Sequence, residues 1–194
     1  MALRGPEGAA LRDAAASLAA LAAAPAAQRE PAIRARFLAL AGKLPDLALA
    51  EGFELIELAR VIDRFGMGTP EMTAPLLALS ARPPAPLGVA VLRVLTQIAA
   101  DHGLGEFELE QLLDLALRDS LAPEAALRRQ SIAALRALPG SRPEQRLERM
   151  GREDPDEANR LAAQAAVIDR RNGKVRYPAP PPRAPGETPT IAHP

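Results

Sequence analysis

Three carboxylates in one stretch of the chain are the clearest candidates for chemistry. Glu106, Glu110 and Asp114 are spaced i, i+4 and i+8, which places them on one face of a helix. Such oxygen ligands could hold a divalent cation if a second helix supplied further acids. No Glu-x-x-His sequence accompanies them. The favoured interpretation is therefore a solvated acidic face, and no metal is predicted.

Asp101-His102 is the second candidate, because a histidine beside a carboxylate can act as a general base or a metal ligand. No serine or second histidine lies near it in the sequence, which favours an exposed residue at a helix end. The chain has no cysteine, so thiolate nucleophiles and cysteine-ligated zinc are excluded. It also lacks a glycine-rich loop ending in Gly-Lys-Ser/Thr. We predict no catalytic residue and no cofactor, and hence a protein that is not an enzyme.

Charge is segregated along the chain although the net charge is zero. Residues 101–124 hold seven acids and one arginine, whereas residues 128–152 hold seven arginines and two acids. Mutual compensation between adjacent helices is the favoured account; the alternative is a bipolar surface that orients a charged partner. On that alternative the partner-binding residues are Arg128, Arg129, Arg142, Arg146, Arg149, Glu106, Glu110 and Asp114.

The proline-rich C-terminal segment, residues 172–194, has no apolar periodicity and is predicted to be a disordered tail. Pro178, Pro181 and Arg183 fit the P-x-x-P-x-Arg pattern that SH3-type grooves bind. Because the pattern is common in proline-rich tails, a plain spacer is the favoured interpretation.

The remaining residues, 1–171, have the composition of a helical domain: alanine, leucine, glutamate and arginine dominate, and β-branched residues are scarce. Apolar periodicity and the positions of proline and glycine predict helices over 8–24, 30–43, 51–65, 70–81, 86–101, 106–120, 124–138, 142–151 and 156–171. The helix over 86–101 is apolar nearly all round, so we expect it at the centre of the domain. The helix over 51–65 carries one apolar stripe that ends at Phe65.

Local signals predict how these helices begin and end. Capping-box spacing marks Ser141 and Asp154 as helix caps. Helix stops are predicted at Gly66, Gly103, Gly140 and Gly173. Acid-first pairs at i, i+4 predict surface ion pairs for Glu30/Arg34, Asp114/Arg118, Glu124/Arg128, Glu148/Arg152 and Asp156/Arg160.

Four segments resemble one another, since each has a proline at or near the start of an Ala/Leu/Arg-rich helix. The prolines are Pro31, Pro86, Pro123 and Pro155, and three of the segments carry an arginine five residues later, at Arg36, Arg128 and Arg160. With its stretch DPDEANRLAAQAA, the chain resembles the HEAT or armadillo-type helical repeat family. The resemblance implies antiparallel helix pairs stacked as a short right-handed solenoid; the alternative is an irregular helical bundle.

These features predict a non-enzymatic scaffold or adaptor that presents a helix-lined, charge-segregated surface to another protein. The alternatives are a regulatory or assembly subunit of a larger complex and, less favoured, a HEAT-like nucleic-acid-binding protein. The absence of tryptophan and the zero net charge argue against nucleic acid. No apolar run reaches the ~18–20 residues of a membrane span, so we expect a cytoplasmic protein.

Overall fold

A computed structural model of the protein describes residues 6–43, 46–80 and 85–174. Over these residues the chain forms helices and no strands, which confirms the predicted all-α class. The elements are α1 (Pro6–Ala22), α2 (Ala26–Ala41), α3 (Leu49–Phe65), the short 3-10 turn η1 (Pro70–Met72), α4 (Thr73–Ser80), α5 (Ala85–His102), α6 (Glu106–Asp119), α7 (Ala125–Ala137), α8 (Ser141–Glu153) and α9 (Glu157–Arg171).

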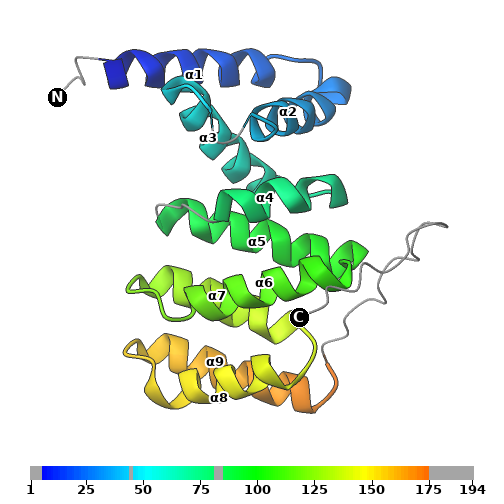
Figure 1. The fold of residues 1–194 in the computed structure, drawn as a ribbon, viewed down its shortest axis with the longest axis vertical. Coiled ribbons are helices and arrows are strands. Elements are labelled where there is room, and N and C mark those ends of the chain that lie inside the picture. Colours follow the sequence, from blue (N-terminus) through cyan, green and yellow to red (C-terminus); the bar gives the residue numbers. More distant parts are fainter. Residues whose placement is uncertain (1–5, 44–45, 81–84, 175–194) are drawn as a thin grey trace, which may run out of the picture.

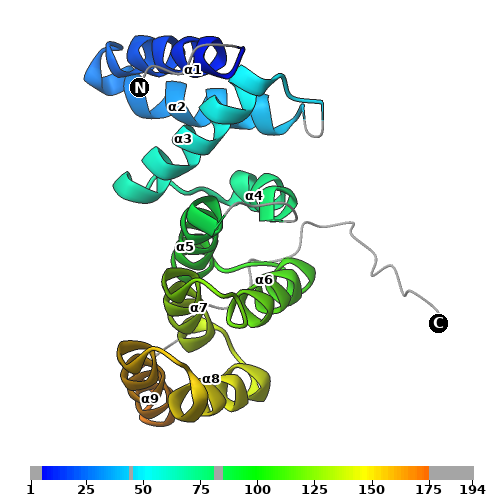
Figure 2. The ribbon, with the colours of Figure 1, turned by 90° about the vertical axis from the view of Figure 1, so that its left-hand side faces the viewer.

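The helices pack in two layers along the long axis of the molecule. In one layer α1, α3, α5, α7 and α9 contact one another in succession, and in the other α2, α4, α6 and α8 do so. Neighbours in the chain also pair across the layers, as α2 with α3, α4 with α5, α6 with α7 and α8 with α9. Figure 1 shows these pairs stacked from α1 at one end to α9 at the other, and Figure 2 shows α4, α6 and α8 on the opposite side from α5, α7 and α9.

Helix α5 lies at the centre of this stack, as its all-round apolar pattern predicted. It contacts α3 and α7 in its own layer and α4 and α6 in the other. Its fully buried side chains are Val91, Leu92, Val94, Leu95 and Ile98. They belong to one continuous apolar core that runs from α2 to α9, so each helix pair depends on its neighbours for burial.

The four glycines predicted to stop helices all adopt positive φ angles. Gly66, at φ 62°, forms a left-handed C-cap for α3, a conformation that a residue with a Cβ adopts only at a cost. The backbone N–H of the following residue, Met67, bonds to the carbonyl of Ile62 and closes the last turn. The ends of α3, α5 and α9 are therefore determined locally, by the glycine that follows each helix.

Three predicted helix starts are wrong. Helix α2 begins at Ala26, so Pro31 lies inside it rather than in its first turn. Gly140 occupies the cap position of α8, and Ser141 is already helical. Helix α9 is capped by Asp156, whose carboxylate accepts the backbone N–H of Asn159, and not by Asp154.

The helix predicted over 70–81 is divided into η1 and α4. Helix α4 starts at Thr73, which places Pro75 in its first turn. Backbone N–H groups there have no partner within the helix, so a proline is tolerated. A helix continuous from residue 70 would have left the carbonyl of Glu71 without its bond.

Only one of the five predicted i, i+4 ion pairs forms among the described residues, that of Glu30 with Arg34. Neighbouring helices supply the partners instead. Asp114 of α6 pairs with Arg142 of α8, and Glu148 of α8 pairs with Arg171 of α9. Long arginine side chains reach carboxylates on the adjacent helix, so charges that sequence spacing assigned to pairs within one helix are paired between helices instead.

Two of the arginines that follow the repeated prolines make the same local contacts. Arg128 Nη1 donates to the carbonyls six and five residues before it, and Arg160 Nη1 does so at the same offsets, the second bond being long at 3.5 Å. Both arginines thereby close the turn that leads into their helix. Arg36 differs: it lies in the other layer and pairs with Glu54 of α3. The segment at Pro31 therefore does not occupy a helix equivalent to those of the segments at Pro123 and Pro155.

Arg170 of α9 closes the opposite end of α7. Its guanidinium donates to the carbonyls of Leu135, Arg136, Leu138 and Gly140. Leu135 and Arg136 belong to the last turn of α7, where carbonyls have no partner within the helix, and Leu138 and Gly140 lie in the turn that leads to α8. Burial lowers the pKa of Arg170, partly offset by Glu144, yet the guanidinium stays charged at neutral pH.

We expect Arg170→Ala to lower the free energy of unfolding by about 2 kcal/mol, because it leaves the part-buried carbonyls of Leu135 and Leu138 without a donor. Arg171→Ala is the matched control: that neighbour forms surface ion pairs with Glu144 and Glu148, which contribute little to stability because solvent screens them. Urea unfolding of both variants measures the difference. Equal losses would contradict the capping role.

Candidate functional site

The predicted binding arginines divide into three groups in the structure. Arg142 donates to Glu110 and, at 2.9 Å, to Asp114, which lie on α6. All three side chains are more than half exposed. At this point the acidic and the arginine-rich segments compensate each other, as the favoured interpretation of the charge pattern predicted.

Arg128 belongs to the core instead of the surface. Its side chain is 9% exposed and that of Asp154 is 2% exposed. The guanidinium Nε and Nη2 donate to the two Asp154 oxygens at 2.9 and 3.1 Å. The Arg128 guanidinium is therefore engaged within the fold, and its prediction as a free surface contact is corrected. Its neighbour Arg129 is exposed, but it donates to Asn159 of α9 at 2.6 Å.

Arg146 and Arg149 form the third group. Together with Arg152, which was not among the predicted residues, we call them the α8 arginine surface. Arg146 donates to the hydroxyl and the carbonyl of Ser120 at 2.7 and 3.0 Å and pairs with no carboxylate of the described chain. Burial, together with the nearby charge of Arg149, lowers the pKa of Arg146. Arg149 has only a long contact, 3.7 Å, with the exposed Glu153.

Two hollows flank this surface. One, of about 380 Å³, lies beside the turn from α6 to α7, and the other, of about 490 Å³, lies along α8 and includes Arg152. Both are lined by Arg146 and Arg149. Arg152 is exposed and makes no ion pair with any described residue. The α8 arginine surface thus keeps donors free for an external group.

Of the other predicted residues, Arg128 also lines the first hollow and Arg142 the second, and the remaining described ones lie in neither. Asp101 and His102 are exposed at the end of α5, and Glu106 is exposed in the first turn of α6. Pro178, Pro181 and Arg183 lie outside the described residues. No group of three or more acidic or histidine side chains placed to hold a metal occurs within the described part of the chain.

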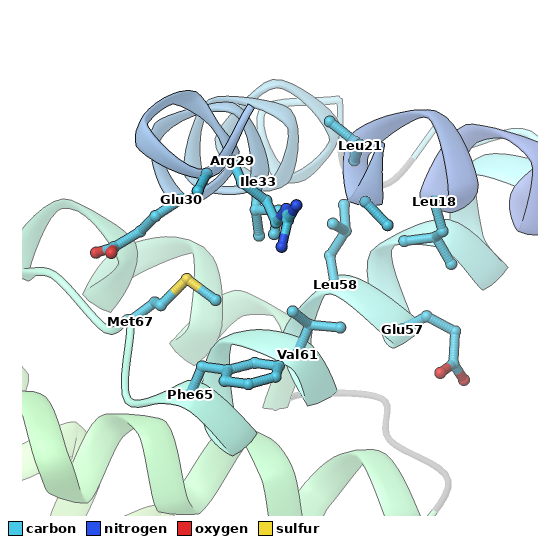
Figure 3. A pocket seen from close by; sticks show the side chains of 12 residues that line it. Leu18, Leu21, Arg29, Glu30, Ile33, Glu57, Leu58, Val61, Phe65 and Met67 are labelled. Carbon is cyan, nitrogen blue, oxygen red and sulfur yellow. The ribbon is translucent and has the colours of Figure 1, made fainter. Parts of the chain in front are cut away.

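An apolar groove among α1, α2 and α3 was missed by the sequence analysis. It has a volume of about 610 Å³ and is lined by Leu18, Leu21, Ala22, Ala26, Arg29, Glu30, Ile33, Glu57, Leu58, Val61, Phe65 and Met67. Figure 3 shows side chains of the three helices converging on it. Phe65, which the stripe on α3 placed in the core, is 65% exposed at its rim.

The groove was not predicted because the residues that line it follow the same apolar periodicity as residues of a buried helix face. Ile33 and Leu58 are indeed buried, and only the way α1 crosses α2 and α3 leaves space above them. Periodicity reports which face of a helix is apolar, but not how completely a neighbour covers it. One sequence feature could have indicated an incompletely covered surface. At the end of the apolar stripe of α3, Phe65 and Met67 flank a glycine that ends the helix.

Comparisons of the chain with protein-family models, with curated proteins and with solved structures find no match. In the part of the chain that the structure describes, no helix has both the length and the apolar character needed to cross a membrane.

Proposed function

We propose that this protein is a non-enzymatic interaction module, built as a short HEAT/armadillo-type stack in the cytoplasm, that presents the α8 arginine surface to an acidic segment of a partner protein. The observation that carries the proposal is the half-buried Arg146, which has no carboxylate partner within the described chain and lines both hollows. The two-layer packing and the repeated loop-closing arginines support the repeat-type stack.

The chemistry of this surface favours carboxylates on the partner. Arginine presents planar, forked donors that match a carboxylate in two-point contacts. Ser120 already orients the Arg146 guanidinium, so less side-chain entropy is lost when an anion binds. Because Arg142 is neutralised by Glu110 and Asp114 of α6, it is not part of the proposed surface.

We expect Arg149→Glu/Arg152→Glu to weaken binding of a fluorescent glutamate-rich peptide roughly tenfold at low salt, since exposed ion pairs contribute up to about 1 kcal/mol each and are screened by salt. These positions are chosen because neither side chain closes a loop or holds a helix end. Fluorescence anisotropy across a salt series measures the effect.

Arg12→Glu/Arg64→Glu is the matched control, since it makes the same charge change on exposed residues of α1 and α3. An equal loss of affinity in the control would show that only net charge matters. An unchanged affinity in the α8 variant would remove the surface from the proposal.

A further inference from the structure

The groove among α1, α2 and α3 is a second site, remote from the α8 arginine surface at the other end of the stack (Figure 1). Its floor is aliphatic: Ile33 of α2 and Leu58 and Val61 of α3. Leu18 and Leu21 of α1 form one wall, the buried Met67 another, and the exposed Phe65 the rim. Its volume of about 610 Å³ lies within the ~300–1,000 Å³ of small-molecule sites.

One cation enters this apolar space. In Figure 3 the Arg29 guanidinium projects over the floor of the groove, whereas the carboxylates of Glu30 and Glu57 point away from it. Both acids are already paired on their own helices, Glu30 with Arg34 and Glu57 with Arg60. Arg29 donates one bond, 3.2 Å long, to the carbonyl of Ala24 and pairs with no carboxylate among the described residues.

An apolar trough with a single inward-facing guanidinium matches an amphiphile of opposite charge. The aliphatic side chains would replace water around a hydrocarbon chain, and the free donors of Arg29 would hold a planar anion by two-point contact. An ammonium head would instead meet a like charge at the same place. The positive charge of Arg29 therefore favours a negatively charged head group, and the apolar side chains of the groove favour a hydrocarbon chain.

We propose that this groove binds an aliphatic carboxylate, with its chain on Ile33, Leu58 and Val61 and its head group on Arg29. The binding is non-covalent. Because it uses residues of α1–α3 only, it does not depend on the proposed function at α8, and the two proposals can fail separately.

The preference for the head group is tested with the full-length protein and three probes whose hydrocarbon chains have equal length: dodecanoate, dodecanol and dodecyltrimethylammonium. Isothermal titration calorimetry, at probe concentrations below micelle formation, measures the affinity for each. We expect dodecanoate to bind roughly tenfold more tightly than dodecanol, because a charge-assisted hydrogen bond is added, and the ammonium to bind most weakly. Arg29→Leu should reduce dodecanoate to the affinity of dodecanol. Arg12→Leu, an exposed arginine of α1 outside the groove, should leave the preference unchanged.

The proposed position of the hydrocarbon chain is tested by filling the groove with a larger side chain. Ala26 lines it and is exposed, so Ala26→Phe occupies the space without removing a core contact and should weaken all three probes at least tenfold. Ala9→Phe, on the exposed side of α1, is the control, and thermal unfolding confirms that each variant is folded. No dodecanoate binding, equal affinities for all head groups, or binding that survives both Arg29→Leu and Ala26→Phe would each overturn the proposal.

Discussion

Asp154→Ala is expected to lower the free energy of unfolding by about 3–5 kcal/mol, the usual cost of removing one partner from a buried ion pair. The Asp154 side chain is 2% exposed, and its two oxygens accept hydrogen bonds from Nε and Nη2 of Arg128. It also accepts the backbone N–H of Asp156. Without it, a guanidinium that is 9% exposed keeps only the carbonyls of Ala122 and Pro123 as partners.

The neighbouring acid is the matched control. Glu153 is 64% exposed and makes only a 3.7 Å contact with Arg149, so Glu153→Ala should change stability by less than about 0.5 kcal/mol. Urea unfolding followed by circular dichroism gives both values. The double variant Arg128→Met/Asp154→Leu should recover much of the loss, because no unpaired charge stays buried. Equal effects of the two single acid substitutions would show that the buried pair is not formed.

The Arg128–Asp154 ion pair also predicts that the stability of the fold decreases at acidic pH. Burial alone would raise the pKa of Asp154, but the hydrogen bonds from Arg128 and the Asp156 N–H outweigh it, so the pKa lies below its ordinary value. A carboxyl group with a lowered folded-state pKa stabilises the fold above its unfolded pKa and loses that contribution as the pH falls. The stability difference between the parent protein and Asp154→Ala should therefore shrink below about pH 4.

Leu95→Ala in α5 should cost about 2–5 kcal/mol, the range for removing a buried leucine side chain and leaving a cavity. Leu95 is fully buried in the continuous core. Helix α5 packs against four neighbours, so the surrounding side chains have little room to collapse into the space.

Leu121→Ala is the control for this change, since Leu121 is 72% exposed in the turn from α6 to α7 and should shift stability by less than about 0.5 kcal/mol. Thermal and urea unfolding compare the two. A loss at Leu95 no larger than that at Leu121 would mean that α5 is not the centre of the stack.

Helix positions could be predicted because the signals that set them are local. The 3.6-residue period of apolar side chains identifies α5 and α6, and a glycine that tolerates positive φ ends α3 at Gly66. The predicted starts failed where two local signals competed. Ser141 and Gly140 both suit a cap position, and the chain uses Gly140. Likewise Asp156 caps α9, because Asp154 is engaged with Arg128.

The candidate sites could not be predicted in the same way, because they depend on contacts between distant residues. Arg128 and Arg146 look alike in the sequence. One is buried against an aspartate 26 positions away, and the other bonds to a serine and lines an open hollow. The groove beside Arg29 arises from three helices that are each ordinary in pattern.

The sequence by itself determined that this protein is helical, where most of its helices lie, and that α5 is central, since backbone hydrogen bonding and apolar periodicity act within a few turns. The tertiary structure alone decided which arginines are buried, which are neutralised by α6, and which keep free donors. It also decided that Phe65 lies at the rim of a groove and not in the core. The physical reason is the same in each case: burial and charge pairing are set by how neighbouring helices cross, and that geometry is not encoded in the period of any one helix.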